Sequence, residues 1–531
     1  MALDYKNKVP IPEHTVRVPN GNAVYIQYIV SSYRNKKGQP TNRRVSIGKL
    51  DPESGLMIPN TRYYELFDKQ PLSALPSMIR SQGSYAAFRG VAQKLGLEKM
   101  VRKVFGERAD TILSVAHYML CEGNVMYYLD DWQEDHLTFS KTLVNTAGLS
   151  KLFAGIGETE RLQFFGQWMK QKREDEYLAY DVTSISSWGH GMDNAEWGYN
   201  RDKEKLPQIN LGMYYGEESR LPLYYRIYPG SIPDKSHLKY MVEDNAVISC
   251  QKARFVMDRG FYSQENLSYL VQKGCRFIIA LPMSLKYCRE LVASHRDEIV
   301  NRSECYLGNG KPYGKSFVVE QMGFRMKVHI YYDPYKAVRD SGNLYEEIEK
   351  QEAELGEMEE PPDKKLHYDR YFYINRSKDG KLGFRRNPAA IDQALSMCGF
   401  FLIGETDFKK TTAQILEIYR RRDIVEKSFE NLKNGLDMRR LRVHSDETAA
   451  GKAFVAFLAL IVRSQMQNML TEYMDANKLT FRKVLLELDK VKLICTSDPV
   501  NPARLLNPPT KCQREIITSL GLKIEAFSQL V

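Results

Sequence analysis

Paired cysteines are missing from this 531-residue chain, although it contains eight cysteines. No two of them have C-x-x-C spacing, and no pair of histidines completes a zinc motif. Scattered cysteines of this kind are typical of free thiols in a reducing cytosol. The sequence therefore gives no indication of a zinc site or of a disulfide framework.

Long hydrophobic segments are missing as well. The N-terminal residues Met-Ala-Leu-Asp-Tyr-Lys contain no apolar signal-peptide core. The longest apolar run, residues 453–462, lies between Lys452 and Arg463 and has about half the length that spans a bilayer. We therefore expect a soluble, cytoplasmic protein in which this run forms a buried helix.

The charge balance is basic. Lys and Arg number 76 and Asp and Glu number 66, so the formal net charge is +10 and the pI is about 8.9. Hydrophobic residues make up 43% of the chain, which is typical of ordered domains, and 531 residues are too many for a single core. A basic chain of several domains, without internal repeats, favours an anionic partner, and nucleic acid first.

Sequence patterns divide the chain into six segments. Period-two alternation predicts strands, and a period of 3.6 residues predicts helices. We expect a basic β-rich region (1–65), a helical region (66–175), a β-β-β-α-β-α-β unit (176–283), a β-rich insertion (284–398), a strand followed by a charged helix (399–448) and C-terminal helices (449–531). The central segments therefore predict an α/β fold.

A basic hairpin is predicted near the N-terminus. Alternation over residues 24–30 and 43–47 predicts two strands, and residues 35–40 have the composition of a turn. The cations of this hairpin are Arg34, Lys36, Lys37, Arg43 and Arg44. They predict contacts with phosphate groups, but a solvated turn has the same composition, and both interpretations stay open.

Two aspartates are predicted to end short apolar strands. Asp181 follows Tyr177-Leu-Ala-Tyr, and Asp258 follows Arg254-Phe-Val-Met. On neighbouring strands, the two carboxylates would point into one cleft. A single aspartate at a strand end more often has a turn or capping role, so the prediction depends on further partners.

A further partner is predicted on the helix that begins near Thr412. Tyr419, Arg422, Glu426 and Lys433 follow one another at steps of three, four and seven residues. Such steps return to one face of a helix, beside an apolar stripe. A solvated charged face is the simpler explanation, with Arg422 and Glu426 forming an intrahelical pair.

Together, the three acids predict a metal site. Asp181, Asp258 and Glu426 would repel one another unless cations neutralise them. Oxygen ligands without cysteine or histidine suit two Mg²⁺ or Mn²⁺ ions, which in phosphodiester chemistry lie about 3.5–4 Å apart. Arg422 and Lys433 would then hold the flanking phosphates. This joint pattern favours a catalytic site over separate structural roles.

With these residues the chain resembles bacterial insertion-sequence transposases of the DDE type, in the group marked Y-x2-R-x3-E-x6-K. Residues 419–433 match that motif at every step. The segments around Asp181 and Asp258 are similar to those that carry the first two acids, and residues 198–209 and 228–234 also look familial. The resemblance covers residues 176–470 well.

The resemblance implies a ribonuclease-H-like catalytic core, in segments 176–283 and 399–448, with an insertion between them. It implies that Asp181, Asp258 and Glu426 are the catalytic metal ligands, and that Tyr419, Arg422 and Lys433 contact DNA. The N-terminal regions, 66–175 included, would bind the inverted repeats at the ends of the element. It also implies a homodimer on DNA, target DNA as a second substrate, and association with the nucleoid.

The chain departs from some relatives in its insertion, because residues 284–398 contain no tryptophan to hold a flipped base. Tyr371 or Phe372 would be the nearest substitutes. Three alternatives remain: a nuclease of the same fold that does not join strands, a non-catalytic DNA-binding derivative, and a phosphatase with Asp181 as nucleophile. The phosphatase is disfavoured because Thr183 stands where the second acid of an Asp-x-Asp pair is required.

Overall fold

The computed structural model describes residues 3–524, except for 6–7, 22, 36–37, 68–75, 141, 143, 172–175, 190, 250–252, 309, 311, 361–366, 377–381 and 497–503. The chain forms two compact units. The first unit comprises residues 1–91, 130–143 and 469–531, and the second comprises residues 92–129 and 144–468. The second unit contains all three acids of the predicted site.

The N-terminal part of the first unit is a four-stranded antiparallel sheet in the order β1-β2-β3-β4. Its elements are β1 (Thr15–Asn20), β2 (Ala23–Arg34), β3 (Pro40–Leu50), β4 (Met57–Pro59) and the helix α1 (Thr61–Phe67). Ile26, Ile47 and Met57 form a separate hydrophobic core for this sheet. The predicted hairpin is therefore confirmed as β2 and β3, which pair with each other.

The rest of the first unit contains strands where the sequence predicts helices. β5 (Pro76–Ser81) and β17 (Arg504–Leu506) flank β16 (Lys492–Thr496) in a three-stranded sheet. Nearby helices are α2 (Gly83–Lys94), α5 (Leu129–Asp135), α16 (Phe481–Asp489) and α17 (Lys511–Ser519). β5 pairs with a strand about 400 residues away, and local periodicity does not reveal pairing at that separation.

The helices of the second unit are α3 (Leu97–Phe105), α4 (Ala109–Glu122), α6 (Thr146–Ala154), α7 (Glu158–Trp168) and α15 (Asp446–Asn477), which continues into the first unit. Phe105, Phe164 and Phe165 pack against Phe454 of α15. α15 is long and apolar enough to cross a membrane by composition, but 89% of its most apolar window is buried inside the protein. The prediction of a buried helix over residues 453–462 is confirmed.

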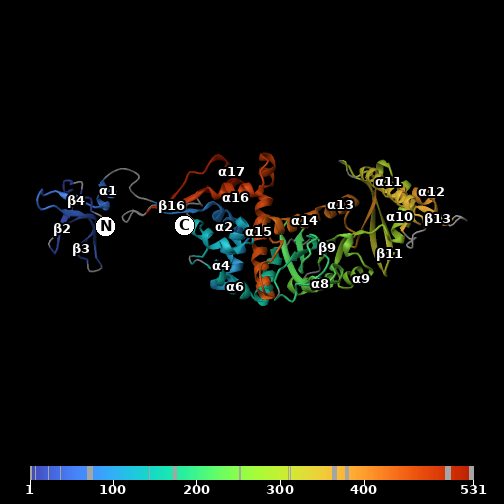
Figure 1. The fold of residues 1–531 in the computed structure, drawn as a ribbon, viewed down its shortest axis with the longest axis horizontal. Helices are drawn as coiled ribbons and strands as arrows, with labels where there is room; N and C mark the ends of the chain where they lie inside the picture. Colours follow the sequence, from blue (N-terminus) through green and yellow to red (C-terminus); the bar gives the residue numbers. More distant parts are fainter. Residues whose placement is uncertain are drawn as a thin grey trace. The chain divides into compact units, whose positions relative to one another are not determined.

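An eight-stranded mixed sheet organises the second unit, in the order β11-β12-β15-β10-β9-β6-β7-β8. Two of its strands, β9 and β11, are labelled in Figure 1. Its central strands are β6 (Leu178–Ser186), β7 (Gln208–Gly216), β8 (Pro222–Pro229), β9 (Arg254–Met257), β10 (Arg276–Leu281) and β15 (Phe400–Glu405). β7 is antiparallel to both of its neighbours, β6 and β8, whereas β6, β9 and β10 run parallel. α8 (Asp234–Ser249) and α9 (Gln264–Gln272) connect the parallel strands.

The insertion, predicted to be β-rich, is partly a continuation of this sheet and otherwise mainly helical. β11 (Tyr313–Gln321) and β12 (Phe324–Tyr332) form a hairpin whose second strand pairs with β15. The remainder contains α10 (Lys286–His295), α11 (Pro334–Glu357), α12 (Pro388–Leu395) and the small hairpin β13 (Phe372–Arg376) and β14 (Leu382–Arg386). Tyr371 and Phe372 are buried in the core of this part, which leaves them unsuited to stack on a base.

Candidate active site

Asp181 lies on β6, and Asp258 directly follows β9, the parallel neighbour of β6 in the sheet. β6 and β9 pair with Leu178 opposite Phe255 and Ala179 opposite Val256, and each aspartate stands two residues after the second of these pairs. Residues two positions apart on an extended strand point to the same face, so we expect both carboxylates on the face that carries Ala179 and Val256. The prediction that Asp181 ends its strand is wrong, because β6 continues to Ser186 in its pairing with β7. Asp258 does follow the last residue of its strand, Met257, as predicted.

Asp181 is a buried acid held by an arginine. Its Oδ1 accepts a hydrogen bond from the Val182 amide at 2.8 Å and lies 3.3 Å from Nη1 of Arg201. Nη2 of Arg201 lies 2.8 Å from Asp234, so this guanidinium bridges two carboxylates. Burial raises the pKa of Asp181, although the charge of Arg201 opposes that rise.

Arg201 and Asp234 also belong to the site, although the sequence motifs did not identify them. The Tyr228 hydroxyl donates to Asp234 at 2.9 Å, which fixes the acid that orients Arg201. Arg201 lies in residues 198–209, and both Asp234 and Tyr228 lie in residues 228–234. These are the two further segments that resemble the transposase family. Their resemblance was the sequence signal that could have identified Arg201 and Asp234 as site residues.

Asp258 is positioned by the turn that follows β9. Its Oδ1 accepts a hydrogen bond from the Arg259 amide at 2.7 Å, as the cap of a short 3₁₀ turn over Arg259–Phe261. The Tyr419 hydroxyl donates to the same oxygen at 3.4 Å. Burial raises the pKa of Tyr419 to about 12, so the phenol remains a proton donor at neutral pH.

The charged helix is interrupted, whereas the sequence predicts a continuous one. α13 (Thr412–Arg421) ends just before Arg422, and α14 (Asp423–Glu430) begins just after it. Residues 431–435 then form a π-helical turn. Thr411 caps α13 through a reciprocal bond with Gln414, which confirms the predicted start. π-Helical turns occur frequently at functional sites, and this turn carries Lys433.

Arg422 lies among the three acids. Its guanidinium is buried, lies 2.9 Å from Glu426 and stands over the ring of Tyr419 at 5.6 Å. Its charge also interacts with Asp258 and Asp181, which help to raise its pKa. α14 packs against β6 and β7, so Glu426 is presented to the sheet that bears the aspartates. The Glu426 side chain remains 55% exposed.

Lys433 holds the loop between β6 and β7. Its Nζ lies 2.6 Å from Asp202, and both Lys433 and its partner are largely removed from solvent. Burial lowers the pKa of Lys433, against the opposing effect of Asp202. Arg440 pairs with Glu204 at 3.1 Å and adds a second tie to the same loop.

The carboxylate oxygens of the three acids suit a divalent cation, but in this structure two of the acids are paired with arginines. Among the described residues, no three acidic, histidine or cysteine side chains lie close enough to hold one metal ion. Arg201 contacts Asp181, and Arg422 contacts Glu426. The carboxylate oxygens of Asp181 and Asp258 are donors of the kind that suits Mg²⁺ or Mn²⁺, and Glu426 would have to leave its arginine partner to join them.

The predicted N-terminal cations belong to the first unit, whereas the acids belong to the second. Arg34, Arg43 and Arg44 are exposed on β2 and β3. Lys36 and Lys37 lie outside the described residues.

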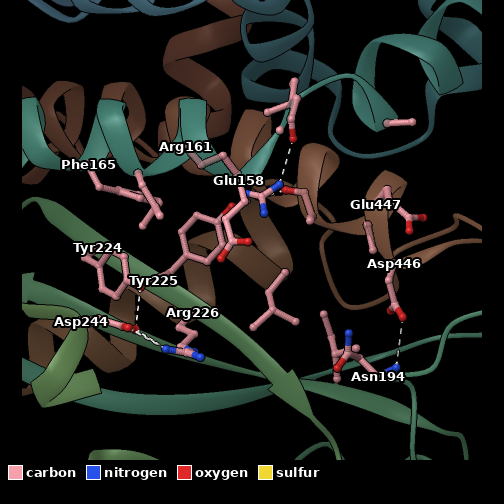
Figure 2. A pocket seen from close by; sticks show the side chains of 18 of the residues that line it. Glu158, Arg161, Phe165, Asn194, Tyr224, Tyr225, Arg226, Asp244, Asp446 and Glu447 are labelled. Atoms are coloured by element: carbon pink, nitrogen blue, oxygen red, sulfur yellow. Dashed lines mark hydrogen bonds and ion pairs between the residues drawn. The ribbon is translucent and has the colours of Figure 1, made fainter. Parts of the chain in front are cut away.

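A cavity of about 540 Å³ lies elsewhere in the second unit, between α7, β8, α8 and the start of α15. Figure 2 shows its charged groups paired with neighbours: Arg226 with Asp244, and Asp446 with the amide of Asn194. None of the three predicted acids lines this cavity, so it is separate from the candidate active site.

The sheet carries Asp181 on β6 and Asp258 at the end of β9, and α14, which packs on that sheet, carries Glu426. Three acids on such elements are suited to phosphodiester chemistry. The sequence profile of a family described as "Transposase DDE domain" matches residues 172–462, more than half of the chain. The chain therefore belongs to the DDE transposase family and is a DNA transposase. Members of this family generally use divalent metal ions.

Two further comparisons do not refine the family assignment. No curated protein matches the chain. A solved piggyBac transposase, in a synaptic complex with hairpin DNA, is 11% identical, and the match covers 77% of this chain and 70% of that one, with a TM-score of 0.33.

The segment after the π-helical turn is anchored by a buried lysine. Lys452 is 2% exposed, and its Nζ donates to the carbonyl oxygens of Leu441 at 2.9 Å and Asn124 at 3.3 Å. Burial lowers the pKa of Lys452 to about 7, with a further decrease from Arg442 and an opposing effect of Asp437. The folded protein therefore binds this proton more weakly than the unfolded chain does.

We expect Lys452 to make stability depend on pH. Because its pKa is lower in the folded state, stability rises between about pH 7 and pH 10, by up to about 1.4 kcal/mol per pH unit. Lys452→Met removes this dependence, so the melting temperature of wild type minus that of the variant increases from pH 7 to pH 9. Lys511→Met, at an 86% exposed lysine, serves as the control. A constant difference would contradict the prediction.

Proposed function

We propose that this transposase acts on a bacterial insertion sequence, and that it cuts the element's ends and joins them to target DNA. The observation that carries the proposal is that Asp181 on β6 and Asp258 at the end of β9 belong to adjacent parallel strands, inside the segment that matches the DDE domain. The Y-x2-R-x3-E-x6-K spacing of residues 419–433 supports membership of that group.

We propose that the core is ribonuclease-H-like. The strand order β8-β7-β6-β9-β10 supports this, since three antiparallel strands are followed by two that run parallel to the first. α13 and α14 follow the last core strand and bring Glu426 to the sheet.

In the proposed mechanism, Asp181, Asp258 and Glu426 would hold two Mg²⁺ or Mn²⁺ ions. The ions would supply activation of an attacking oxygen and stabilisation of the leaving oxygen of a phosphodiester. Tyr419 keeps the carboxylate of Asp258 oriented through its hydrogen bond. Arg201, itself held by Asp234, orients the carboxylate of Asp181.

DNA contacts follow from the same proposal. Two copies of the chain bring two ends together, and the basic N-terminal hairpin contributes phosphate contacts through Arg34, Arg43 and Arg44. The protein would act in the cytoplasm, associated with the nucleoid.

The test is a joining assay with DNA that carries the element's own ends. Purified protein with Mg²⁺ should produce both cleaved ends and covalent joints to a target plasmid. Cleavage without joints would support a nuclease of the same fold. Binding of the ends without cleavage would support a non-catalytic derivative.

We expect Arg422→Ala and Lys433→Ala to weaken binding of end DNA and to reduce its salt dependence by about one counterion each. Both cations have carboxylate partners in the absence of DNA, so the competing role is structural. Binding titrations at several salt concentrations, together with melting curves, separate the two roles. An unchanged salt slope with a lower melting temperature would identify structural ion pairs.

A further inference from the structure

The loop between β6 and β7, residues 187–207, exposes three aromatic side chains. Trp188 is 64% exposed, Trp197 is 67% exposed and Tyr199 is 84% exposed. The chain has four tryptophans, and the other two, Trp132 and Trp168, are buried. Large aromatic side chains gathered on one exposed segment are unusual unless they bind something.

The backbone of this loop lies against the protein. A Cβ atom at Gly189 would lie 2.6 Å from the carbonyl oxygen of Val443, and one at Gly198 would lie 1.9 Å from that of Gly230. The carbonyl of Tyr199 accepts a hydrogen bond from Gln208 at 2.9 Å. Each exposed tryptophan is thus followed by a glycine that permits close backbone contact. These contacts fix the backbone that carries the aromatic side chains.

A basic segment, Arg439–Arg442, runs beside the first of these tryptophans. The Arg440 guanidinium stands over the ring of Trp188 at 5.4 Å. The segment is joined to β6 by backbone bonds, since the Ser186 amide donates to Arg439 at 3.0 Å and the Leu441 amide donates to Ser186 at 3.2 Å. The side chains of Arg440 and Arg442 remain 40% and 44% exposed.

The aromatic loop and the basic segment are connected to the candidate active site. Ser186 stands five residues beyond Asp181 on β6, roughly 16 Å along an extended strand. Arg201, from the same loop, contacts Asp181 directly. A DNA strand with a phosphate near the acids therefore has bases within reach of this surface.

We propose that Trp188, Trp197 and Tyr199, together with the basic segment, form a stacking surface for unpaired DNA bases next to the cleavage site. Cations alone suffice to hold phosphates, but aromatic rings stack only on bases whose faces are open, as in single-stranded or distorted DNA. The inference rests on the proposed function, because it takes the bound strand to be the one that is cut.

The test compares two oligomers with the same number of phosphates: oligo(dT) of about 12 nucleotides and an abasic oligomer of equal length. Wild type should bind oligo(dT) about tenfold or more tightly, since stacking contributes about 1–3 kcal/mol per base. Trp188→Ala combined with Trp197→Ala should abolish this preference and leave binding of the abasic oligomer unchanged. Trp188→Phe with Trp197→Phe should keep most of the preference.

Two further measurements complete the test. Oligo(dT) should quench the tryptophan fluorescence of wild type, and the double Phe variant should lose this quenching because its remaining tryptophans are buried. Tyr335→Ala, at an 84% exposed aromatic residue of α11, is the matched control and should behave as wild type.

Equal binding of both oligomers by wild type would overturn the inference, as would a preference that survives in the double Ala variant. A double Ala variant that changes only the oligomeric state would assign the surface to a second copy of the chain, and would also overturn it. Failure of the proposed function is distinguishable, because wild type would then form no joints to target DNA while the oligomer comparison remains measurable.

Discussion

Replacing Asp181 or Asp258 by Asn, or Glu426 by Gln, is expected to lower the rate of strand cleavage and of joining by roughly a thousandfold or more. A bound divalent ion contributes several kcal/mol of charge stabilisation in the transition state, and each 1.36 kcal/mol corresponds to a factor of ten. Each substitution keeps the shape of the side chain and removes one negative charge. Cleavage and joining of labelled end DNA in Mg²⁺ measure the effect.

The matched control is Glu430→Gln, because Glu430 stands one turn beyond Glu426 on α14 and is likewise exposed. It should retain nearly wild-type activity. Binding of end DNA should survive all four substitutions, since it depends on basic surfaces. A Glu426→Gln variant that cleaves at a near wild-type rate, or full activity of wild type in excess chelator, would refute the assignment.

The ion pairs at the site require a stability control. Glu426→Gln leaves the buried guanidinium of Arg422 without its closest carboxylate, and Asp181→Asn leaves Arg201 with Asp234 alone. Removing one partner of a buried pair is often destabilising. Melting temperatures therefore have to accompany the rates, so that loss of catalysis is separated from loss of folded protein.

Features set by neighbouring residues were predictable from the sequence. The hairpin of β2 and β3, the start of α13 at Thr412 and the buried run over residues 453–462 all have local signals: alternation, a capping residue and continuous apolar side chains. The position of Asp258 at the end of β9 was also predictable, because the apolar residues before it form a local strand signal.

Features set by distant contacts were not predictable. The hairpin of β11 and β12 extends the central sheet because β12 pairs with β15, about 75 residues later in the chain. The π-helical turn at residues 431–435 lies where Asn431 bonds to Gln467 and Arg463 of α15, which no periodicity in residues 419–433 encodes. Arg201 contacts Asp181 and Asp234, and these contacts require β6, β7 and β8 to be folded together.

The arrangement of the second unit also changes where the chain can be divided. A cut at residue 176 follows the change in sequence pattern, but α3, α4, α6 and α7 belong to the same compact unit as the catalytic sheet. Phe165 of α7 packs against Tyr224 of β8, and Trp168 donates to the carbonyl of Pro222 at 2.9 Å. α7 therefore covers part of the sheet, and a fragment that starts at residue 176 would expose that part.

The N-terminal sheet offers a better boundary, because it has its own hydrophobic core of Ile26, Ile47 and Met57. A variant that begins at residue 76 keeps β5 and everything after it. We expect this variant to retain metal-dependent cleavage of arbitrary DNA and to lose its preference for the element's ends. Specific binding typically exceeds non-specific binding by about a thousandfold or more, so the expected loss is of that order.

Competition between an end duplex and a random duplex of equal length measures this preference. Full-length protein with Arg34, Arg43 and Arg44 replaced by Ala is the informative comparison, because phosphate contacts supply affinity and base-edge contacts supply specificity. That variant should bind both duplexes more weakly by a similar factor, whereas the truncated chain should bind them equally. If the truncated chain still prefers the ends as strongly as the full chain, the N-terminal sheet is a scaffold and recognition lies in the remaining residues.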